Sequence, residues 1–279
     1  MKIETITNSY KDNNEDIHGK TEHAFWIIDG ALPLSKAKFT KESSDVIWMV
    51  HWWHRYLSNH LEQFNKSIVT ILEEGMVLLN TEFSQYADIS NLSKLDRASA
   101  TIAIVRINSG FVESYVLGDS EINIRTQEGK IKTIIDEKIE ALDQEVIDMI
   151  FNNKERKNCI AFNGYTDEEL KVLRQNRMKM NSKEGYYILE HDIEGIKHGI
   201  YSEIELSKIQ DILMMSDGYS AIYSKYKKMT LTQLMDSCKS EGLEAVLNQI
   251  RSIEDNDVDF TAYKRLRVHD DATAIYIDL

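Results

Sequence analysis

Four aspartates stand beside apolar segments that have the character of buried strands. The segment "ILMMSDGYS" (212–220) runs four apolar residues into Asp217, and "AFWIIDGA" (24–31) does the same with Asp29. Asp119 follows the apolar part of "VESYVLGDS", and Asp270 precedes a C-terminal apolar segment, 272–277. Short apolar runs bounded by glycine are consistent with strands buried on both faces. If the four strand ends converge, these carboxylates lie within a few ångströms of one another.

Such a cluster needs a compensating positive charge, because two like charges about 4 Å apart repel by roughly 4 kcal/mol at an effective dielectric near 20. No lysine or arginine recurs beside these aspartates, so we expect hard divalent cations, which prefer carboxylate, carbonyl and water oxygens. Gly30 exposes a backbone carbonyl as a further ligand. Two ions roughly 3.5–4 Å apart would make a hydroxide nucleophile from a bridging water and hold the oxygens of a phosphate ester.

The elements that must position these acids are predicted from periodicity. Apolar residues between 41 and 88 recur at three- and four-residue spacing, which predicts two consecutive amphipathic helices, the first capped by Ser43 or Ser44. Segments 99–107 and 111–126 alternate around Asn108-Ser109-Gly110, which predicts an antiparallel hairpin. We also predict helices at 137–152 and 167–180, two more within 230–256, and a strand at 185–192. Hairpins and helix pairs without regular strand–helix alternation favour an α+β fold over a doubly wound parallel sheet.

The composition favours one domain. The 279 residues, 42% of them hydrophobic, can form one large core, and nothing resembles a linker, so 1–279 are expected to form a single domain. The polar N-terminus lacks the apolar region of a secretory signal, and no window approaches about 18 apolar residues, so we expect a soluble cytoplasmic protein. The formal net charge of -13 disfavours nonspecific binding to nucleic acid or to an anionic membrane.

Two basic stretches, 223–229 and 263–269, interrupt this acidic chain. Both are interpreted mainly as solvated edges. The second directly precedes Asp270 and is therefore also a candidate to face an anionic substrate.

The order of motifs along the chain resembles the metal-dependent protein phosphatase family, protein phosphatase 2C. The resemblance runs from residue 11 to the C-terminus and is carried by six short motifs: Asn14-Glu15-Asp16, Asp29-Gly30, Ser99-Ala100-Thr101, Gly118-Asp119-Ser120, Ser216-Asp217-Gly218 and Asp270-Asp271-Ala272-Thr273. It implies two antiparallel sheets flanked by pairs of antiparallel helices, a four-layer α-β-β-α sandwich, with two Mn²⁺ or Mg²⁺ ions at one end. It also implies that a metal-bridging hydroxide hydrolyses phosphoserine or phosphothreonine in a phosphorylated protein substrate, without a phosphoenzyme.

The resemblance also implies roles for individual residues. Asp29 would bridge both ions, while Asp217 and Asp270 would hold the first, and these three would act in catalysis through metal-activated water. The second ion would be served by the Gly30 carbonyl and by Glu15, the latter through water.

Other positions of the motifs would support these ligands. Asp16, Asn14 and Asp271 would lie behind them, and Asp119 would face a more weakly bound third ion. Members with a third-ion site often carry an acid where this chain has Ala221. Two ions should therefore bind well and a third poorly.

Two further positions depart from the family's pattern. Many members clamp the substrate phosphate with an arginine four residues before the glutamate, where this chain has Lys11, which binds phosphate as a point charge without the two-pronged geometry. Some members follow Asp-Gly with a histidine that acts as general acid, whereas this chain has Ala31. The leaving-group proton would then come from metal-bound water or another side chain.

Residues 137–205 occupy the place of the family's variable flap and are expected to select the substrate.

Two other functions remain open at this point. Asp29 as a covalent nucleophile would want a second acid two residues on, but position 31 is alanine, and a parallel βα pattern does not follow. A catalytically weak or silent phosphatase-like module that binds a partner is favoured by Lys11 and Ala31 and opposed by the retained metal acids. His51 and His54 lack a carboxylate or cysteine at helical spacing and are interpreted as packing or surface residues.

Overall fold

The computed structural model describes residues 1–35, 37–152 and 165–279. Within these residues the chain forms ten strands and eight α-helices. The strands are β1 (Lys2–Asn8), β2 (Asp16–Lys20), β3 (Ala24–Ala31), β4 (Ser99–Asn108), β5 (Phe111–Leu117), β6 (Glu121–Thr126), β7 (Ile131–Ile134), β8 (Ile200–Glu205), β9 (Ile209–Met215) and β10 (Ala272–Asp278). The helices are α1 (Asp45–His60), α2 (Ile68–Phe83), α3 (Lys138–Asn152), α4 (Asp167–Met178), α5 (Ile193–Ile196), α6 (Asp217–Ser224), α7 (Leu231–Ser240) and α8 (Leu243–Asp255).

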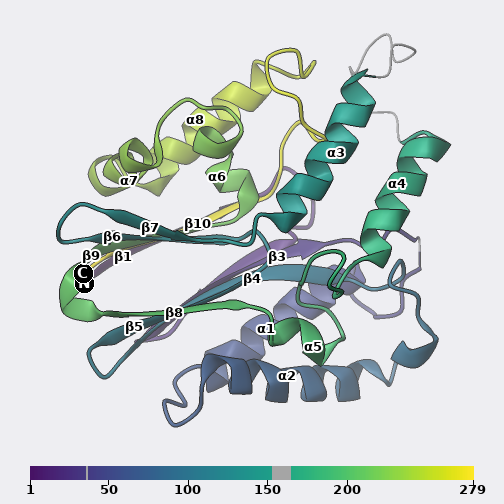
Figure 1. Ribbon diagram of the computed structural model, residues 1–279, viewed down its shortest axis with the longest axis horizontal. Coiled ribbons are helices and arrows are strands. Elements are labelled where there is room, and N and C mark those ends of the chain that lie inside the picture. The colour runs from purple at the N-terminus through teal and green to yellow at the C-terminus, as the bar shows by residue number, and fades with distance from the viewer. Residues whose placement is uncertain (36, 153–164) are drawn as a thin grey trace.

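The strands form two five-stranded antiparallel sheets, with orders β1-β10-β9-β6-β7 and β2-β3-β4-β5-β8. Helices α6, α7 and α8 cover the outer face of the first sheet, and α1, α2 and α5 cover the outer face of the second (Figure 1). Helices α3 and α4 lie together at one end of the sandwich (Figure 1). The predicted α+β class and the four-layer α-β-β-α sandwich are therefore confirmed.

The central strands are buried on both faces, as their apolar runs predict. In β3, Trp26 and Ile28 join the core under α1 and α2, while Phe25 and Ile27 join the core between the sheets. Alternate residues of 212–215 in β9 divide in the same way between the core under α6–α8 and the core between the sheets. These strands therefore carry no polar face, and a side chain can reach solvent only where a strand ends.

The helices and the hairpin follow the sequence closely. The two predicted helices of 41–88 are α1 and α2, and Ser44 caps the first by accepting a hydrogen bond from the Ile47 N–H at 3.2 Å. The β4–β5 hairpin turns at Ser109 and Gly110, both with positive φ. Within the described residues, no helix is both long and apolar enough to cross a membrane.

Two predicted strands need correction. The segment 111–126 is two strands, because the chain turns at Gly118, where φ is +91°, and β6 continues in the opposite sheet. The segment 185–192 is not a strand and makes only isolated bridges at Tyr186 and Leu189. Its apolar residues 186–189 are nevertheless buried. Their apolar pattern therefore indicated that they are buried, but not that they pair with a neighbouring strand.

Candidate metal centre

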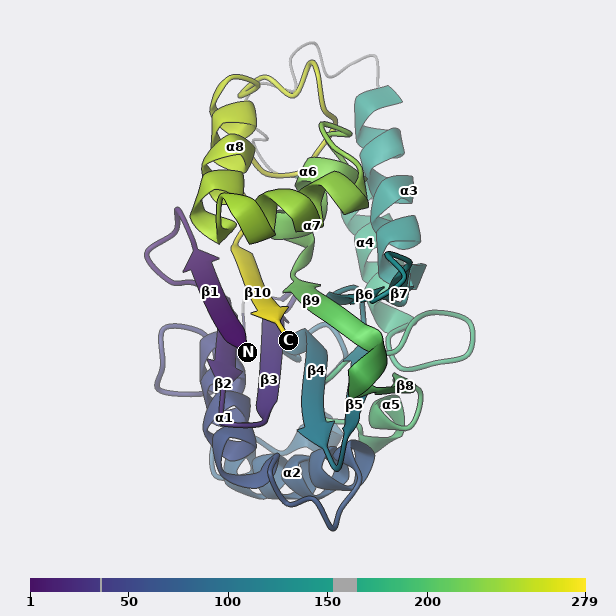
Figure 2. The same ribbon diagram turned by 90° about the vertical axis from the view of Figure 1, so that its left-hand side faces the viewer.

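The acids singled out in the sequence meet at one end of the sandwich. Strand pairing places Asp16 directly opposite Asp29. Asp217 is the first residue of α6 and follows β9, while Asp270 precedes β10, which pairs with β9 (Figure 2). Burial holds the pKa of Asp29 well above its usual range, and the charges of Asp16, Asp217, Asp119 and Asp270 raise this pKa further. The tertiary structure therefore gathers the carboxylates that the strand-end pattern singles out.

Glycine at position 30 allows a close approach between β3 and the segment before β2. The Gly30 N–H donates to the carbonyl oxygen of Glu15 at 3.1 Å. A Cβ on Gly30 would lie 2.8 Å from that oxygen and 2.6 Å from Cγ2 of Val46. A larger residue would push Glu15 away from Asp29, so this glycine sets the spacing of two predicted ligands.

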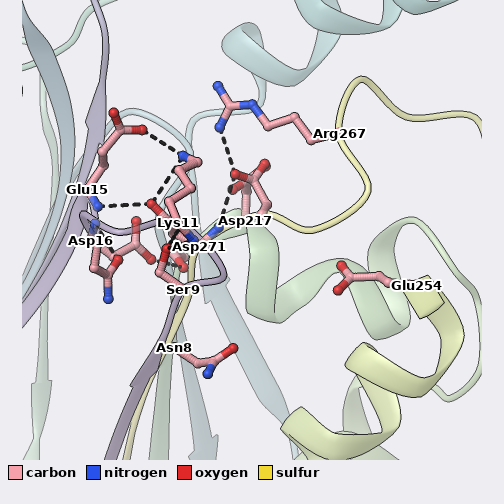
Figure 3. A network of polar contacts seen from close by, with 12 residues as sticks. Asn8, Ser9, Lys11, Glu15, Asp16, Asp217, Glu254, Arg267 and Asp271 are labelled. Carbon is pink, nitrogen blue, oxygen red and sulfur yellow. Dashed lines mark hydrogen bonds and ion pairs between the residues drawn. The ribbon is translucent and has the colours of Figure 1, made fainter. Parts of the chain in front are cut away.

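Asp271 holds the Glu15 segment in place (Figure 3). Its carboxylate accepts hydrogen bonds from the Glu15 N–H at 2.9 Å and from the Ser9 hydroxyl at 2.6 Å. The Lys11 ammonium donates to Oδ2 of Asp271 at 3.4 Å and to Oε2 of Glu15 at 2.8 Å. Asn14 adds a smaller contact, because its side-chain oxygen accepts from the Asp16 N–H at 3.0 Å. Asp271 and Asn14 thus stand behind the predicted ligands.

Asp16 ties the two sheets together beneath the cluster. Its Oδ2 accepts from the Ser216 hydroxyl at 2.8 Å, and Ser216 in turn accepts from the Thr273 N–H at 3.0 Å. Oδ1 of Asp16 is buried and has no hydrogen-bond partner among the described residues. Burial raises the pKa of Asp16, with a further contribution from the charges of Asp271 and Asp217. A buried carboxylate oxygen without a partner is unfavourable unless a cation or a proton compensates it.

No lysine or arginine recurs beside these acids along the sequence, but the folded chain brings two cations to them. The Lys225 ammonium lies 2.7 Å from Oδ2 of Asp217, and Nη1 of Arg267 lies 2.8 Å from Oδ1 of Asp270. Helix α6 ends at residue 224, so Lys225 lies two helical turns from Asp217, and the segment before β10 directs Arg267 back toward Asp270. Both cations belong to the two basic stretches that were interpreted mainly as solvated edges.

These pairs alter the protonation of the site. Burial is the largest single influence on the pKa of Asp217 and would raise it, but the charge and hydrogen bond of Lys225, the charge of Arg267 and the Gly218 N–H together outweigh burial, and the pKa lies below its usual value. The pKa of Lys225 lies above its ordinary value: the surrounding protein lowers it, but the charges of Asp217, Asp270 and Asp119 and the hydrogen bond to Asp217 together raise it more. Both members of this pair are therefore charged at neutral pH.

The comparisons with known proteins agree with this geometry. The family model "Protein phosphatase 2C" matches residues 10–250 of the chain. The chain belongs to the protein phosphatase 2C family. The matched region contains Glu15, Asp29 and Asp217, and Asp270 lies beyond it. No curated protein sequence matches the chain.

Solved phosphatase structures share the protein phosphatase 2C fold with this chain. The serine/threonine phosphatase Stp1 from Staphylococcus aureus is 12% identical, with a TM-score of 0.58 over 99% of this chain and 94% of that chain. The serine/threonine phosphatase PstP/Ppp of Mycobacterium tuberculosis is 13% identical, with a TM-score of 0.58 over 100% and 98%. The catalytic domain of PstP in complex with two manganese ions is 12% identical, with a TM-score of 0.53 over 99% and 97%. At these identities the likeness shows the fold.

One acid of this protein phosphatase 2C chain was not anticipated from the sequence. Asp143 lies on α3, within the 137–205 segment, and its side chain is exposed. The surrounding protein raises its pKa, with a further upward contribution from Asp217. Asp143 in turn contributes, after burial and Asp217, to the raised pKa of Asp119. The amphipathic pattern of 137–152 predicts the helix, but it contains no signal for the side of the molecule on which the helix packs.

The donor set suits hard cations. Within the described ranges, no group of three acidic, histidine or cysteine side chains is arranged to hold a metal ion as the side chains stand. The residues that converge are nevertheless carboxylates with a backbone carbonyl beside them, which are the ligands that Mg²⁺ and Mn²⁺ prefer. Oδ1 of Asp16 is a buried acceptor without a partner among the described residues, and four neighbouring carboxylates add to burial in raising the pKa of Asp29. These residues therefore fit divalent cations.

Proposed function

We propose that this chain is a metal-dependent phosphatase that hydrolyses phosphoserine or phosphothreonine in phosphorylated proteins. The observation that supports this most strongly is the convergence of acids around Asp29: Asp16 lies opposite it in the sheet, and the charges of Asp16, Asp217, Asp119 and Asp270 add to burial in raising its pKa. Solved structures of the same fold are named serine/threonine phosphatases, which supports a phosphoprotein substrate. One of them is a complex with two manganese ions, which supports Mn²⁺ as a cofactor.

The ligands that we propose are those of the family pattern. Asp29 would be shared by two ions, Asp217 and Asp270 would hold the first, and Glu15 with the Gly30 carbonyl would serve the second. Asp119 would face a third ion, which we expect to bind poorly because Ala221 offers no carboxylate. When bound, the two ions lower the pKa of a water shared between them and polarise the phosphate oxygens.

The chain's own residues position this chemistry. Asp271 fixes the Glu15 backbone through its N–H, and the Ser216 hydroxyl fixes Asp16 beneath Asp29. Ala31 has no proton to give, so the leaving-group oxygen would take its proton from water or from another side chain. We also propose that the 137–205 segment, which includes α3, α4, α5 and β8, selects the substrate.

A second function, a catalytically weak or silent phosphatase-like binding module, is favoured by one observation. Lys225 and Arg267 already neutralise Asp217 and Asp270, so metal ions must compete with them for these carboxylates. If that competition is lost, the site would bind phosphorylated partners without hydrolysing them.

The proposal is tested by hydrolysis of an aryl phosphate and of a phosphoserine peptide, with and without Mn²⁺. We expect Mn²⁺-dependent turnover that D29N reduces at least a hundredfold, while D12N, which alters an exposed acid outside the cluster, retains it. Thermal unfolding with Mn²⁺ is the second readout, since a bound ion stabilises the folded state. A melting temperature that rises with Mn²⁺ without any turnover would support the silent module instead.

We further propose that the protein acts in the cytoplasm as a single domain, 1–279. The net charge of -13 argues against nucleic acid or an anionic membrane as a partner.

A further inference from the structure

Three cationic side chains contact the acids of the site, and they differ in how fully they are neutralised. Lys11 is shared by two carboxylates, those of Glu15 and Asp271. Among the residues that the structure describes, the Lys225 ammonium pairs only with Asp217 and the Arg267 guanidinium only with Asp270. Among the described residues, Nε and Nη2 of Arg267 have no hydrogen-bond partner, and its side chain is 51% exposed. Arg267 therefore has donors that an incoming anion can reach.

We propose that Arg267 and Lys225, and not Lys11, bind the phosphate group of the substrate. This inference rests on the phosphatase function proposed above. It assigns the phosphate contact to two residues outside the position where the family's pattern has an arginine.

The charges around each cation explain the choice. Asp217 and Asp270 are proposed metal ligands, and a bound divalent ion offsets their negative charge. Arg267 then loses its paired negative charge, and Lys225 keeps only the charges of Asp119 and Asp143, with which it forms no ion pair among the described residues. Lys11 differs in having two partners: an ion at Glu15 would offset the 2.8 Å contact, but Lys11 keeps the carboxylate of Asp271 at 3.4 Å, which stands behind the ligands, so its charge remains partly neutralised. A phosphate dianion is therefore attracted to Arg267 and Lys225 more strongly than to Lys11.

Arg267 also has the better geometry. Its guanidinium is a planar fork that can donate two parallel hydrogen bonds to phosphate oxygens, whereas a lysine ammonium acts as a point charge. Figure 3 shows Arg267 directed at the acids from one side and Lys11 lying between Glu15 and Asp271 on the other. A phosphate held by ions at Asp270 would thus lie next to the free edge of the Arg267 guanidinium.

The segment that carries Arg267 is held on both sides. Two residues before it, Arg265 forms an ion pair with Asp257 at 2.6 Å and donates to the Asp257 carbonyl at 2.7 Å. Two residues after it, His269 contacts Asp255 at 2.7 Å and stacks on Tyr10 with ring centroids 3.9 Å apart. The backbone at Arg267 is therefore preorganised, and only its side chain has to reorient toward a phosphate.

The same positions make a second, independent measurement informative. Lys225 and Arg267 compete with metal ions for Asp217 and Asp270, so removal of either positive charge should tighten Mn²⁺ binding while it weakens phosphate binding. A purely structural role for these residues predicts that both affinities fall together. Opposite movement of the two affinities is therefore the signature of the proposed role.

The test uses the full chain and isothermal titration calorimetry, first with Mn²⁺ and then with inorganic phosphate added to the Mn²⁺-loaded protein. We expect R267M and K225M each to weaken phosphate binding roughly tenfold, the size expected for loss of one charged hydrogen bond. Both should bind Mn²⁺ several-fold more tightly. R267K keeps the charge but loses the fork, so it should fall between wild type and R267M, and it replaces R267M if thermal unfolding shows that R267M does not fold. K11M should change phosphate affinity less than threefold.

Several outcomes would overturn the inference. One is unchanged phosphate affinity in R267M and K225M, another is loss of phosphate binding in K11M alone, and a third is a fall of both affinities together in R267M and R267K. Absence of phosphate binding to the Mn²⁺-loaded wild type would do the same. Phosphate binding that depends on Arg267 without any turnover would refute the proposed phosphatase function and leave this inference standing. Mn²⁺-dependent turnover, with a phosphate affinity that R267M does not change, would support the proposed phosphatase function and refute this inference.

Discussion

Substitution of Gly218 by alanine tests the close contact between α6 and the backbone just before β10. Gly218 is the second residue of α6, and a Cβ placed there would lie 2.0 Å from the carbonyl oxygen of Asp271 and 3.3 Å from Cβ of Asp270. Since real Cβ contacts essentially never fall below 3.0 Å, the helix and the strand must separate by about 1 Å. The obstacle is a backbone atom, so no side chain can rotate to relieve it.

Two effects of the substitution oppose each other in the free energy of unfolding. Replacing glycine by alanine within a helix stabilises it by up to about 1 kcal/mol. Forcing extra volume into a packed contact costs typically about 1–3 kcal/mol. Because the clash is between backbones, we expect the second effect to dominate, with a net loss of about 1–2 kcal/mol.

The same displacement should damage the site. Asp217 and Asp270 lie on the two segments that are pushed apart, and a misplacement near 1 Å can cost about a hundredfold in activity. We therefore expect weaker Mn²⁺ binding by calorimetry together with a lower midpoint of urea unfolding.

The matched control is G110A in the β4–β5 turn. Gly110 has φ of +84° and open space around it, so alanine there should cost about 1–2 kcal/mol from the left-handed backbone alone. It should leave the Mn²⁺ affinity unchanged. If G218A is as stable as the wild type and binds Mn²⁺ equally well, the close contact between α6 and the start of β10 is not real, and the reasoning fails.

Three further predictions concern stability. In R106M the free energy of unfolding, measured in urea, should fall by about 3–5 kcal/mol, because Arg106 is buried against Glu113 at 2.6 Å and the variant leaves that carboxylate uncompensated. A double variant with E113Q should recover part of the loss. No recovery would contradict the ion-pair argument. Burial lowers the pKa of His191 to about 4, so the unfolded state takes up the proton first as the pH falls. The free energy of unfolding of the wild type should therefore fall by up to about 3 kcal/mol between about pH 6.5 and about pH 4. H191Q should show a correspondingly shallower pH dependence of this free energy. S44A should cost about 1 kcal/mol through loss of the α1 cap, and S43A should cost nothing measurable; equal losses would show that the cap is shared.

The sequence by itself determined the parts of this protein that depend on local chemistry. Apolar runs at 25–28 and 212–215 are buried on both faces because every residue in them is apolar, whichever way it points. The β4–β5 hairpin and the Ser44 cap follow from turn and capping residues that act within a few positions of themselves. The acids at strand ends could be predicted from the sequence because each directly adjoins its apolar run along the chain.

Pairing with distant segments decided the rest of the fold. Strand β2 is short and polar and forms because it pairs with β3, in a register that sets Asp16 opposite Asp29. At 118–120 the chain passes from β5 in one sheet to β6 in the other, and distant strands, β8 and β9, complete the pairing of each. The segment 185–192 looked like a strand because burial in an irregular segment and burial in a sheet select the same apolar residues.

The charge balance of the site was likewise decided by tertiary structure. Lys225 and Arg267 belong to basic stretches that look like solvated edges, and nothing in their spacing shows that α6 and the segment before β10 direct them at Asp217 and Asp270. The charge of Asp143 influences the acids of the site only because α3 packs at that end of the sandwich. A sequence shows which residues carry charge, but the energy between charges depends on distances through space, and only the folded chain sets those distances.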